Sequence, residues 1–450
     1  MTAAALAPMA GDSAPQLLPA LREWEDRTFE GVRLSPEGHL LAARLAGGGE
    51  GRLEVTELRE GLRVRARSWV GVVRLGGVEI RVVPKLAGDQ LGLVRLLELV
   101  TGLDGLTRLA GDASLELAGE SLLDLVALLF SEACQGVLRR GLLADYVERE
   151  EALPMVRGRI LADRQVLARF GQLDRIECRF DELEHDVDEN RLLAAALRAA
   201  HQRVRSAAVR RRLARLRAVF DPICDVLQLD LGSARKDIAY NRLNAHYEQA
   251  HGLAWMLLDG LGVDDLLAPG GTRSFAFLLD MNLLFERFVE KLVRRALPDH
   301  YRVRYQAAQG SIIWNATVQR PYARVVPDLL VESRGHPPAR LAIDAKYKLY
   351  DERRLDPSDI YQTFLYAYAL GARPDEGPPT SLILYPSSLE GPQPVRLRIH
   401  PLHDRGAAEI LGLGISIPTA LGEWNGNQTG GIIETLGLRI RDLLTSPTTQ

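Results

Sequence analysis

The hydrophobic pattern of this 450-residue chain changes twice, so no single regular architecture fits all of it. Between about residues 21 and 86, apolar residues recur at every second position, and Gly76-Gly77 separates two such runs, which predicts β-hairpins. From about 89 to 265 the apolar residues follow helical spacing. From about 275 onward, helical and alternating segments follow one another, which indicates an α/β arrangement.

These patterns predict an α+β multidomain protein. We expect a disordered tail over 1–20, a small N-terminal β domain over 21–88, and a central helical domain over 89–266. A C-terminal α/β domain with a mixed sheet should occupy 275–445. Within the helical region, the stretch 148–160 contains a proline and a glycine, and we expect it to be extended.

Composition narrows the class of protein. The net charge is −3, so any surface for nucleic acid must be local. The three cysteines form no CxxC pair, which argues against a disulfide framework or a zinc site and favours a cytoplasmic setting. No apolar run approaches the length of a membrane span, and the N-terminus lacks the basic region of a signal peptide.

Two aspartates and a lysine stand close together in "PDLLVESRGHPPARLAIDAKYKL". If this stretch is a hairpin, Asp328 and Asp344 meet near one end, and Lys346 shares a strand face with Asp344. Paired carboxylates repel each other unless a cation neutralises them, and oxygen ligands suit Mg²⁺ or Mn²⁺. The pattern therefore predicts metal-dependent hydrolysis of a phosphodiester. The alternative is two ordinary strands with charged ends.

The helices on either side of this stretch carry further candidates. Glu286, on the preceding helix, could complete the shell of a metal, whereas Glu290 fits an ion pair on the helix surface better. On the following helix, Gln362 and Tyr366 are four residues apart and share one face. They could contact the metal site or DNA. The alternative is a helix packed by Tyr361, Phe364, Leu365 and Tyr368, with Gln362 merely exposed.

A basic stretch, residues 201–217, contains seven arginines. A phosphate-binding helix is one interpretation. We favour the other, a solvated helix whose apolar residues face a core. These apolar residues are Val204, Val209, Leu213 and Leu216.

The motifs PD at 327–328, DAK at 344–346 and YQxxxYA at 361–367 resemble those of the PD-(D/E)xK nuclease superfamily. Other segments resemble McrC, the nuclease subunit of McrBC-type modification-dependent restriction systems. These segments are "GVVRLGGVEIRVVPKL", "RRGLLADYVEREEALPMVRGRI", "FDELEHDVDENRLLAAAL" and "MNLLFERFV", and the resemblance covers about residues 60 to 440.

This resemblance implies roles for the candidate residues. Asp328 and Asp344 would bind Mg²⁺ or Mn²⁺ with the carbonyl of Ala345, and Lys346 would act on the attacking water. Glu286 is a further candidate ligand. Gln362 and Tyr366 would lie on the supporting helix.

The resemblance also implies partners. A McrC-like chain acts on double-stranded DNA, in this family modified DNA, with a McrB-like AAA+ GTPase that forms a hexameric ring. The β domain at 21–88 would then dock into this ring, and Lys85 could touch it. The chain itself contains no Gly-Lys dipeptide and hence no P-loop, so it has no nucleotide site of that kind.

Two alternatives remain open. One is a stand-alone PD-(D/E)xK nuclease for DNA repair or processing, although the three scattered cysteines do not suit the iron–sulfur cluster found in such enzymes. The other is a non-catalytic activator of an AAA+ motor that keeps a decayed nuclease fold. The presence of Asp328, Asp344 and Lys346 argues against decay.

Overall fold

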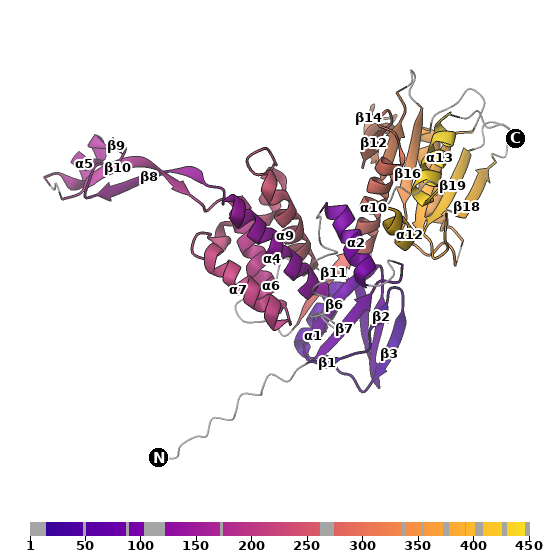
Figure 1. The fold of residues 1–450 in the computed structure, drawn as a ribbon, viewed down its shortest axis with the longest axis horizontal. Helices are drawn as coiled ribbons and strands as arrows, with labels where there is room; N and C mark the ends of the chain where they lie inside the picture. Colours follow the sequence, from indigo (N-terminus) through magenta and orange to yellow (C-terminus); the bar gives the residue numbers. More distant parts are fainter. Residues whose placement is uncertain are drawn as a thin grey trace, which may run out of the picture. The chain divides into compact units, whose positions relative to one another are not determined.

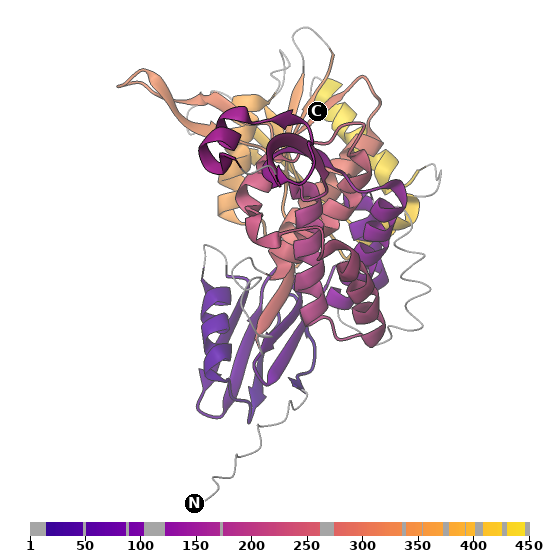
Figure 2. The ribbon, with the colours of Figure 1, turned by 90° about the vertical axis from the view of Figure 1, so that its left-hand side faces the viewer.

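The computed structural model divides into two compact units (Figures 1 and 2). The first comprises residues 1–70, 75–112 and 278–450, and the second comprises 71–74 and 113–277. The structure describes residues 15–47, 51–86, 90–102, 122–171, 174–261, 274–334, 339–352, 354–371, 378–391, 393–400, 408–424 and 430–445. The several sheets and many helices confirm an α+β multidomain protein. None of the described helices is long and apolar enough to cross a membrane.

The N-terminal β region consists of two sheets. In the first, the order is β1-β7-β6-β11, and β2 also pairs with β7. Gly76, at the turn between β6 and β7, has φ +65°, a conformation that glycine adopts without strain. The strands are β1 (Gln16–Leu17), β2 (Leu21–Arg22), β6 (Trp69–Leu75), β7 (Val78–Val83) and β11 (Phe275–Asp280).

The second sheet is antiparallel, with the order β3-β5-β4. Its strands are β3 (Asp26–Glu30), β4 (Leu53–Leu58) and β5 (Gly61–Ala66). Helix α1 (Pro36–Ala46) begins after Ser35, whose hydroxyl accepts the Gly38 N–H, and it packs against β4.

The expectation of a disordered tail over 1–20 is wrong at its end. Gln16 and Leu17 pair with Val78 and Glu79, and Leu18 is buried. The first fourteen residues lie outside the described part of the chain. The error arose because β1 is only two residues long, too short to show an alternating pattern.

The second unit is a helical bundle with a long β-ribbon. Helices α4, α6, α7 and α9 pack against one another through their apolar faces. Their bounds are α4 (Leu122–Arg140), α6 (Asp188–Arg203), α7 (Ala207–Phe220) and α9 (Glu248–Leu261), with a short α8 (Leu231–Asp237) beside them. The helices from 122 to 261 agree with the helical pattern of this region, but strands interrupt them, and residues 90–101 of the expected helical domain over 89–266 belong to the first unit.

These strands form a sheet with the order β8-β10-β9, and they include the stretch near 148–160 that we expected to be extended. Strand β8 (Asp145–Leu153) pairs with β10 (Ile176–Glu184) over nine residues. Strand β9 (Arg159–Ile160) and helix α5 (Ala162–Arg169) lie at the far end of this ribbon (Figure 1).

The C-terminal region of the first unit is built on a six-stranded mixed sheet with the order β12-β15-β16-β17-β19-β18. Strands β16, β17 and β19 are parallel, and the outer pairings are antiparallel. The strands are β12 (Arg302–Tyr305), β15 (Leu329–Glu332), β16 (Arg340–Ala345), β17 (Thr380–Pro386), β18 (Gln393–Ile399) and β19 (Ala408–Ile415). A separate antiparallel ribbon is formed by β13 (Gln309–Asn315) and β14 (Arg320–Val325).

Helices cover both faces of this sheet. Helix α11 (Pro357–Leu370) packs over β16, β17 and β19. Ile343 points away from Ala342 and α11, yet it is fully buried, so the other face is covered too. The helices that also contact β16 are α10 (Met281–Ala296) and α13 (Ile432–Thr445); α2 (Gln90–Thr101) and α12 (Ile417–Trp424) pack with them.

The N-terminal β region and the C-terminal sheet are joined by a buried carboxylate. Glu23 is 2% exposed, and its Oε2 accepts the Tyr347 hydroxyl at 2.9 Å and the Lys85 N–H at 2.8 Å. The Tyr347 ring packs between Trp24 and Phe285, with centroid distances of 5.4 and 5.6 Å. Burial raises the pKa of Glu23 to about 7, and the bonds from Lys85 and Tyr347 counteract this only in part.

The raised pKa of Glu23 predicts a pH-dependent stability. Because the folded state holds this proton more tightly than the unfolded state, Glu23 lowers stability as pH rises from about 4.5 through 7. Glu23→Gln keeps an oxygen for both donors but cannot ionise. Its free energy of unfolding should therefore match that of the wild type near pH 4.5 and exceed it by about 3 kcal/mol at pH 8.

Urea denaturation at several pH values measures this difference. Glu30→Gln, a change at an exposed position of β3, is the control and should show no such trend. An equal difference between Glu23→Gln and the wild type at all pH values would contradict the prediction.

Candidate active site

The two aspartates lie at one end of the β15–β16 hairpin, where the sequence predicted them to meet. Asp328 immediately precedes β15, and Asp344 is the last residue but one of β16. The two strands pair in register from Leu329 opposite Ile343. The Ala345 N–H donates to Asp328 Oδ2 at 2.7 Å, which fixes the first aspartate against the strand that carries the second.

Asp344 is buried in an unusual way for a carboxylate. It is 1% exposed, and neither of its oxygens accepts a well-oriented hydrogen bond from the described residues. The Lys346 ammonium lies 2.9 Å from Oδ2 as an ion pair, which compensates part of the charge. A buried carboxylate with unsatisfied oxygens is costly, and a bound cation would remove that cost.

The electrostatics of the pair agree with this interpretation. Burial, followed by the charge of Asp328, raises the pKa of Asp344. Burial and the charge of Glu286 raise the pKa of Asp328. Such mutual perturbation of carboxyl groups is typical of functional sites and marks a place where positive charge is favoured.

Lys346 is held between the aspartates and α11. Its Nζ donates to Gln362 Oε1 at 3.2 Å, the Gln362 amide donates to the Tyr366 hydroxyl at 2.7 Å, and that hydroxyl donates to the Val326 carbonyl at 3.0 Å. Gln362 is thus exposed, but its side-chain amide bonds both Lys346 and Tyr366. Burial alone would lower the pKa of Lys346, but the charges of Asp344 and Asp328 outweigh it and raise the pKa.

Glu286 lies near the pair on α10, half-buried. Its Oε2 accepts the Tyr305 hydroxyl at 3.2 Å, and burial is the main cause of its raised pKa. The described residues contain no group of three His, Cys, Asp or Glu side chains already placed to hold a metal. The charge of Glu286 raises the pKa of Asp328. A role of Glu286 as a direct metal ligand stays a prediction.

The residues that fit a divalent cation are Asp328 and Asp344. The unsatisfied oxygens of Asp344 are the observation that supports the fit, and the donor set of hard oxygens suits Mg²⁺ or Mn²⁺. Ala345 is 6% exposed and directly follows Asp344. Its backbone carbonyl, the third metal ligand that the family resemblance implies, therefore lies at the same end of β16.

Other candidates have structural partners. Glu290 is 9% exposed and pairs with Arg287 at 3.2 Å and Arg294 at 3.0 Å, as expected for a helix ion pair. Lys85 Nζ forms an ion pair with Glu352 at 3.0 Å. The contact of Lys85 with a partner therefore stays a prediction. Such a contact would require the ion pair between Lys85 and Glu352 to break.

The expectation of one solvated helix over 201–217 is wrong in part, because the stretch comprises the end of α6, a connection over 204–206 and most of α7, and Arg203 is buried. The four apolar residues are buried, as predicted. Arg217 pairs with Asp221 at 2.9 Å, and Arg212 pairs with Glu132.

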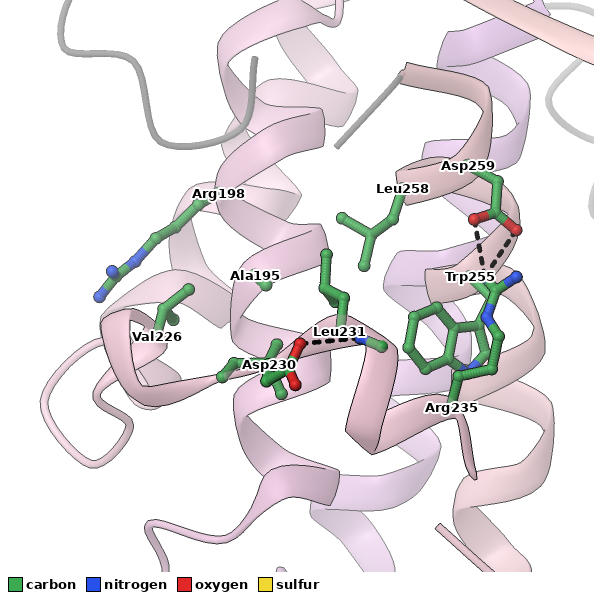
Figure 3. A pocket seen from close by; sticks show the side chains of 11 residues that line it. Ala195, Arg198, Val226, Asp230, Leu231, Arg235, Trp255, Leu258 and Asp259 are labelled. Carbon is green, nitrogen blue, oxygen red and sulfur yellow. Dashed lines mark hydrogen bonds and ion pairs between the residues drawn. The ribbon is translucent and has the colours of Figure 1, made fainter. Parts of the chain in front are cut away.

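A pocket of about 500 Å³ lies in the second unit, between α6, α8 and α9 (Figure 3). Arg235 lies over the Trp255 ring at 4.4 Å and bonds both carboxylate oxygens of Asp259 at 2.6 and 2.8 Å. Asp230 Oδ1 accepts the Gly232 N–H at the start of α8. These charged groups already have partners, so the pocket shows none of the features of the aspartate site.

Two residues of the site were not predicted. Tyr305, on β12, bonds Glu286 and lies under the Arg287 guanidinium at 3.9 Å. Tyr347, next to Lys346, binds Glu23. Tyr305 is one of several aromatic residues in alternating strands, and only the fold brings it to α10. The position of Tyr347 directly after Lys346 is the sequence signal that could have identified it.

Comparison with known proteins identifies the family of the chain. The family model described as "McrBC 5-methylcytosine restriction system component" matches residues 64–386. No curated protein matches the chain.

Among solved structures, the fold resembles a chain in the "Refined half-complex from tetradecameric assembly of Thermococcus gammatolerans McrB AAA+ hexamers with bound McrC". The TM-score is 0.61 and the identity 19%, over 95% of this chain and 100% of that one. A weaker match, at a TM-score of 0.46 and 22% identity over 64% of this chain and 90% of that one, is a chain of the Thermococcus gammatolerans McrBC complex.

The family model covers well over half of the sequence, and the first structural match extends over nearly its whole length. The chain therefore belongs to the family of McrBC restriction system components.

Proposed function

We propose that this chain is the McrC-like nuclease subunit of a GTP-driven restriction complex, and that its C-terminal sheet is a PD-(D/E)xK nuclease core. It would be a metal-dependent endonuclease that hydrolyses phosphodiesters of modified double-stranded DNA. The observation that carries this proposal is Asp344, buried with unsatisfied oxygens beside Asp328 and Lys346. Family membership supports the restriction system.

In this proposal, Asp328, Asp344 and the Ala345 carbonyl hold Mg²⁺ or Mn²⁺, with Glu286 beside them. A divalent ion supplies Lewis-acid polarisation of phosphate oxygens and a more acidic water. The protein's part is to keep these carboxylates together and in place. The Ala345–Asp328 hydrogen bond and the pairing of β15 with β16 perform that task.

Lys346 would act as a fixed positive charge. Its raised pKa keeps the ammonium protonated at neutral pH, so it can orient a water and offset charge that develops on the phosphate. Gln362, which bonds both Lys346 and Tyr366, restricts where the ammonium can point.

The McrC in the similar solved structure is bound to McrB AAA+ hexamers. We infer that the partner of this chain is a McrB-like GTPase. The chain would stimulate GTP hydrolysis by that partner. Our sequence-based expectation was docking through the β domain at 21–88, and it stays untested. The exposed apolar residues favour a second surface, the end of the β8–β10 ribbon.

This ribbon end combines paired charges with unpaired apolar groups. Helix α5 has no buried residue, and Leu167 and Phe170 are 87% and 85% exposed. Along the ribbon, arginines pair with glutamates across the strands, for example Arg179 with Glu150. An exposed apolar end on a charge-neutralised stalk is suited to insertion into another protein. Met155, Val156, Ile160 and Val166 extend the apolar surface.

Metal binding is tested by stability rather than by cleavage. A cation at one hundred times its dissociation constant stabilises the folded state by about 2.7 kcal/mol. We expect Mn²⁺ to raise the melting temperature of the wild type but not of Asp344→Asn. Asp299→Asn, at an exposed position, should respond as the wild type does.

Without metal, Asp344→Asn should be more stable than the wild type at pH 8, because burial and the charge of Asp328 both disfavour the carboxylate. An equal response of all three proteins to Mn²⁺ would contradict the assignment of the site.

Cleavage is tested with the chain, a McrB-like GTPase, Mg²⁺ and GTP on plasmids with and without 5-methylcytosine. Asp344→Ala should lower cleavage at least a thousandfold while GTPase stimulation stays at the wild-type level. Persistent GTPase stimulation by a wild-type chain that never cleaves DNA would favour the non-catalytic activator. Cleavage by the chain alone would favour the stand-alone nuclease.

Docking is tested with Leu167→Asp/Phe170→Asp, which places two charges at the ribbon end. We expect loss of assembly with the GTPase by gel filtration, and loss of its stimulation. The matched control is Leu40→Asp in the β domain, where Leu40 is 65% exposed. If Leu40→Asp alone disrupts assembly, the β domain is the docking surface.

A further inference from the structure

The β13–β14 ribbon is joined at both ends to strands of the aspartate site. Its first strand follows β12, which carries Tyr305, and its second strand ends three residues before Asp328. At its base, the Gln306 N–H donates to the Asp328 carbonyl at 2.8 Å, and the Gln306 amide donates to the Tyr305 hydroxyl at 3.0 Å. The ribbon extends away from the sheet (Figure 2). Strand β14 therefore leads from the end of the ribbon to Asp328.

The charge of this segment differs from that of the whole chain. Residues 300–327 contain four arginines and no aspartate or glutamate, in a chain whose net charge is −3. The two arginines on β12, Arg302 and Arg304, lie beside Glu332 of β15. The two on the ribbon, Arg320 and Arg324, form no side-chain ion pair or hydrogen bond with any described residue.

Arg320, Tyr322 and Arg324 lie on β14, and all three side chains are exposed, Tyr322 by 73%. The pairing with β13 is irregular here, since Ile313 lies opposite Ala323 and Trp314 opposite Pro321, so Tyr322 stands at a bulge between the two arginines. Val325, the last residue of β14, packs in a core cluster that includes Leu330 of the sheet. We call these three residues the β14 stripe.

The β8–β10 ribbon provides a contrast within the same chain. There five arginines pair with glutamates, for example Arg149 with Glu184 and Arg157 with Glu182 at 2.9 Å. A ribbon suited to a protein partner and a ribbon suited to a polyanion thus differ in whether their guanidinium groups are already paired.

The end of the β13–β14 ribbon is internally braced. Asn315 Oδ1 accepts the N–H groups of Thr317 and Val318 at 3.0 and 3.1 Å. The Gln319 amide donates to the Ala316 carbonyl at 2.8 Å. These bonds preform the turn, so the stripe needs little ordering when a ligand binds.

We propose that the β14 stripe is a DNA-gripping element of the nuclease site, which places duplex DNA against Asp328 and Asp344. This inference rests on the proposed nuclease function. Four strand residues span about 14 Å, close to the ~12 Å width of the major groove. A two-stranded ribbon can enter that groove, so the exposed Arg320 and Arg324 would reach phosphates on its two walls.

The test compares two charge reversals in the full chain assembled with a McrB-like GTPase. Arg320→Glu/Arg324→Glu removes the charges of the stripe. Arg211→Glu/Arg215→Glu makes the same change in charge on α7, at two exposed arginines of the other unit. Binding of a fluorescent duplex to the complex is followed by anisotropy over a range of salt concentrations, in Ca²⁺ to prevent turnover, and cleavage is measured in Mg²⁺.

We expect the stripe variant to bind the duplex at least tenfold more weakly and to cleave it correspondingly more slowly. The slope of log affinity against log salt should fall by about 1.8, which corresponds to two lost phosphate contacts. The α7 variant should stay within twofold of the wild type. Arg320→Gln/Arg324→Gln should show an intermediate loss, and thermal melting should show that all variants fold.

Each contrary result has a distinct meaning. Equal losses in both reversals would show a general charge effect and overturn the assignment of the stripe. Wild-type binding and cleavage by the stripe variant would overturn it as well, and so would loss of GTPase assembly alone, which would make the ribbon a protein-binding element. A wild-type complex that neither binds nor cleaves DNA would instead refute the proposed nuclease function.

Discussion

The buried carboxylate of Asp344 is the constraint on which the C-terminal region depends. A charge that is 1% exposed and lacks oriented hydrogen bonds costs free energy in the folded state. The surrounding structure must therefore be stable enough to keep it in place. Paired strands on both sides of β16 and helices on both faces of the sheet meet this demand.

From Asp344 the constraint spreads through polar contacts. Lys346 must lie close enough to compensate part of the charge, and Gln362 and Tyr366 fix Lys346 in turn. Tyr366 is 4% exposed and ends the network on a backbone carbonyl. The rotation of α11 about its axis is thus tied to the position of the lysine, because a turned helix would break each of these bonds.

A second chain of contacts leads from Lys346 into the N-terminal β region. Tyr347 directly follows the lysine, and its hydroxyl bonds Glu23. The segment that carries Lys346 is therefore held from the C-terminal sheet on one side and from the β region on the other. The β region contributes to the support of the site in addition to any role in partner binding.

Sequence alone predicted the elements whose patterns are local. The β15–β16 hairpin, with Asp328 and Asp344 at one end, followed from two apolar runs around a Gly-Pro turn. The helical pattern of α11 correctly put Gln362 and Tyr366 on one face. The alternative, a helix packed by Tyr361, Phe364, Leu365 and Tyr368, is correct for Phe364, which packs against a core cluster, but wrong for Tyr361 and Tyr368, which are 72% and 61% exposed.

Features set by distant contacts escaped prediction. Strand β19 lies between β17 and β18 in the sheet. Its glycines weaken the alternating sequence pattern by which a strand is predicted. Gly414 is needed because an added Cβ would lie 2.9 Å from the Ser387 side chain. The bonds of Glu23 to Tyr347 and of Glu286 to Tyr305 join residues 324 and 19 positions apart, and no local pattern reports such pairs.

The order of the chain through the two units has an evolutionary consequence. The second unit is drawn almost entirely from one continuous stretch, 113–277, while the residues of the aspartate site and their supports come from both sides of it. Such an inserted module can be lengthened, shortened or exchanged by recombination at its two ends without moving Glu23, Asp328 or Lys346. A change of length in the β8–β10 ribbon therefore leaves the residues of the aspartate site in their own unit.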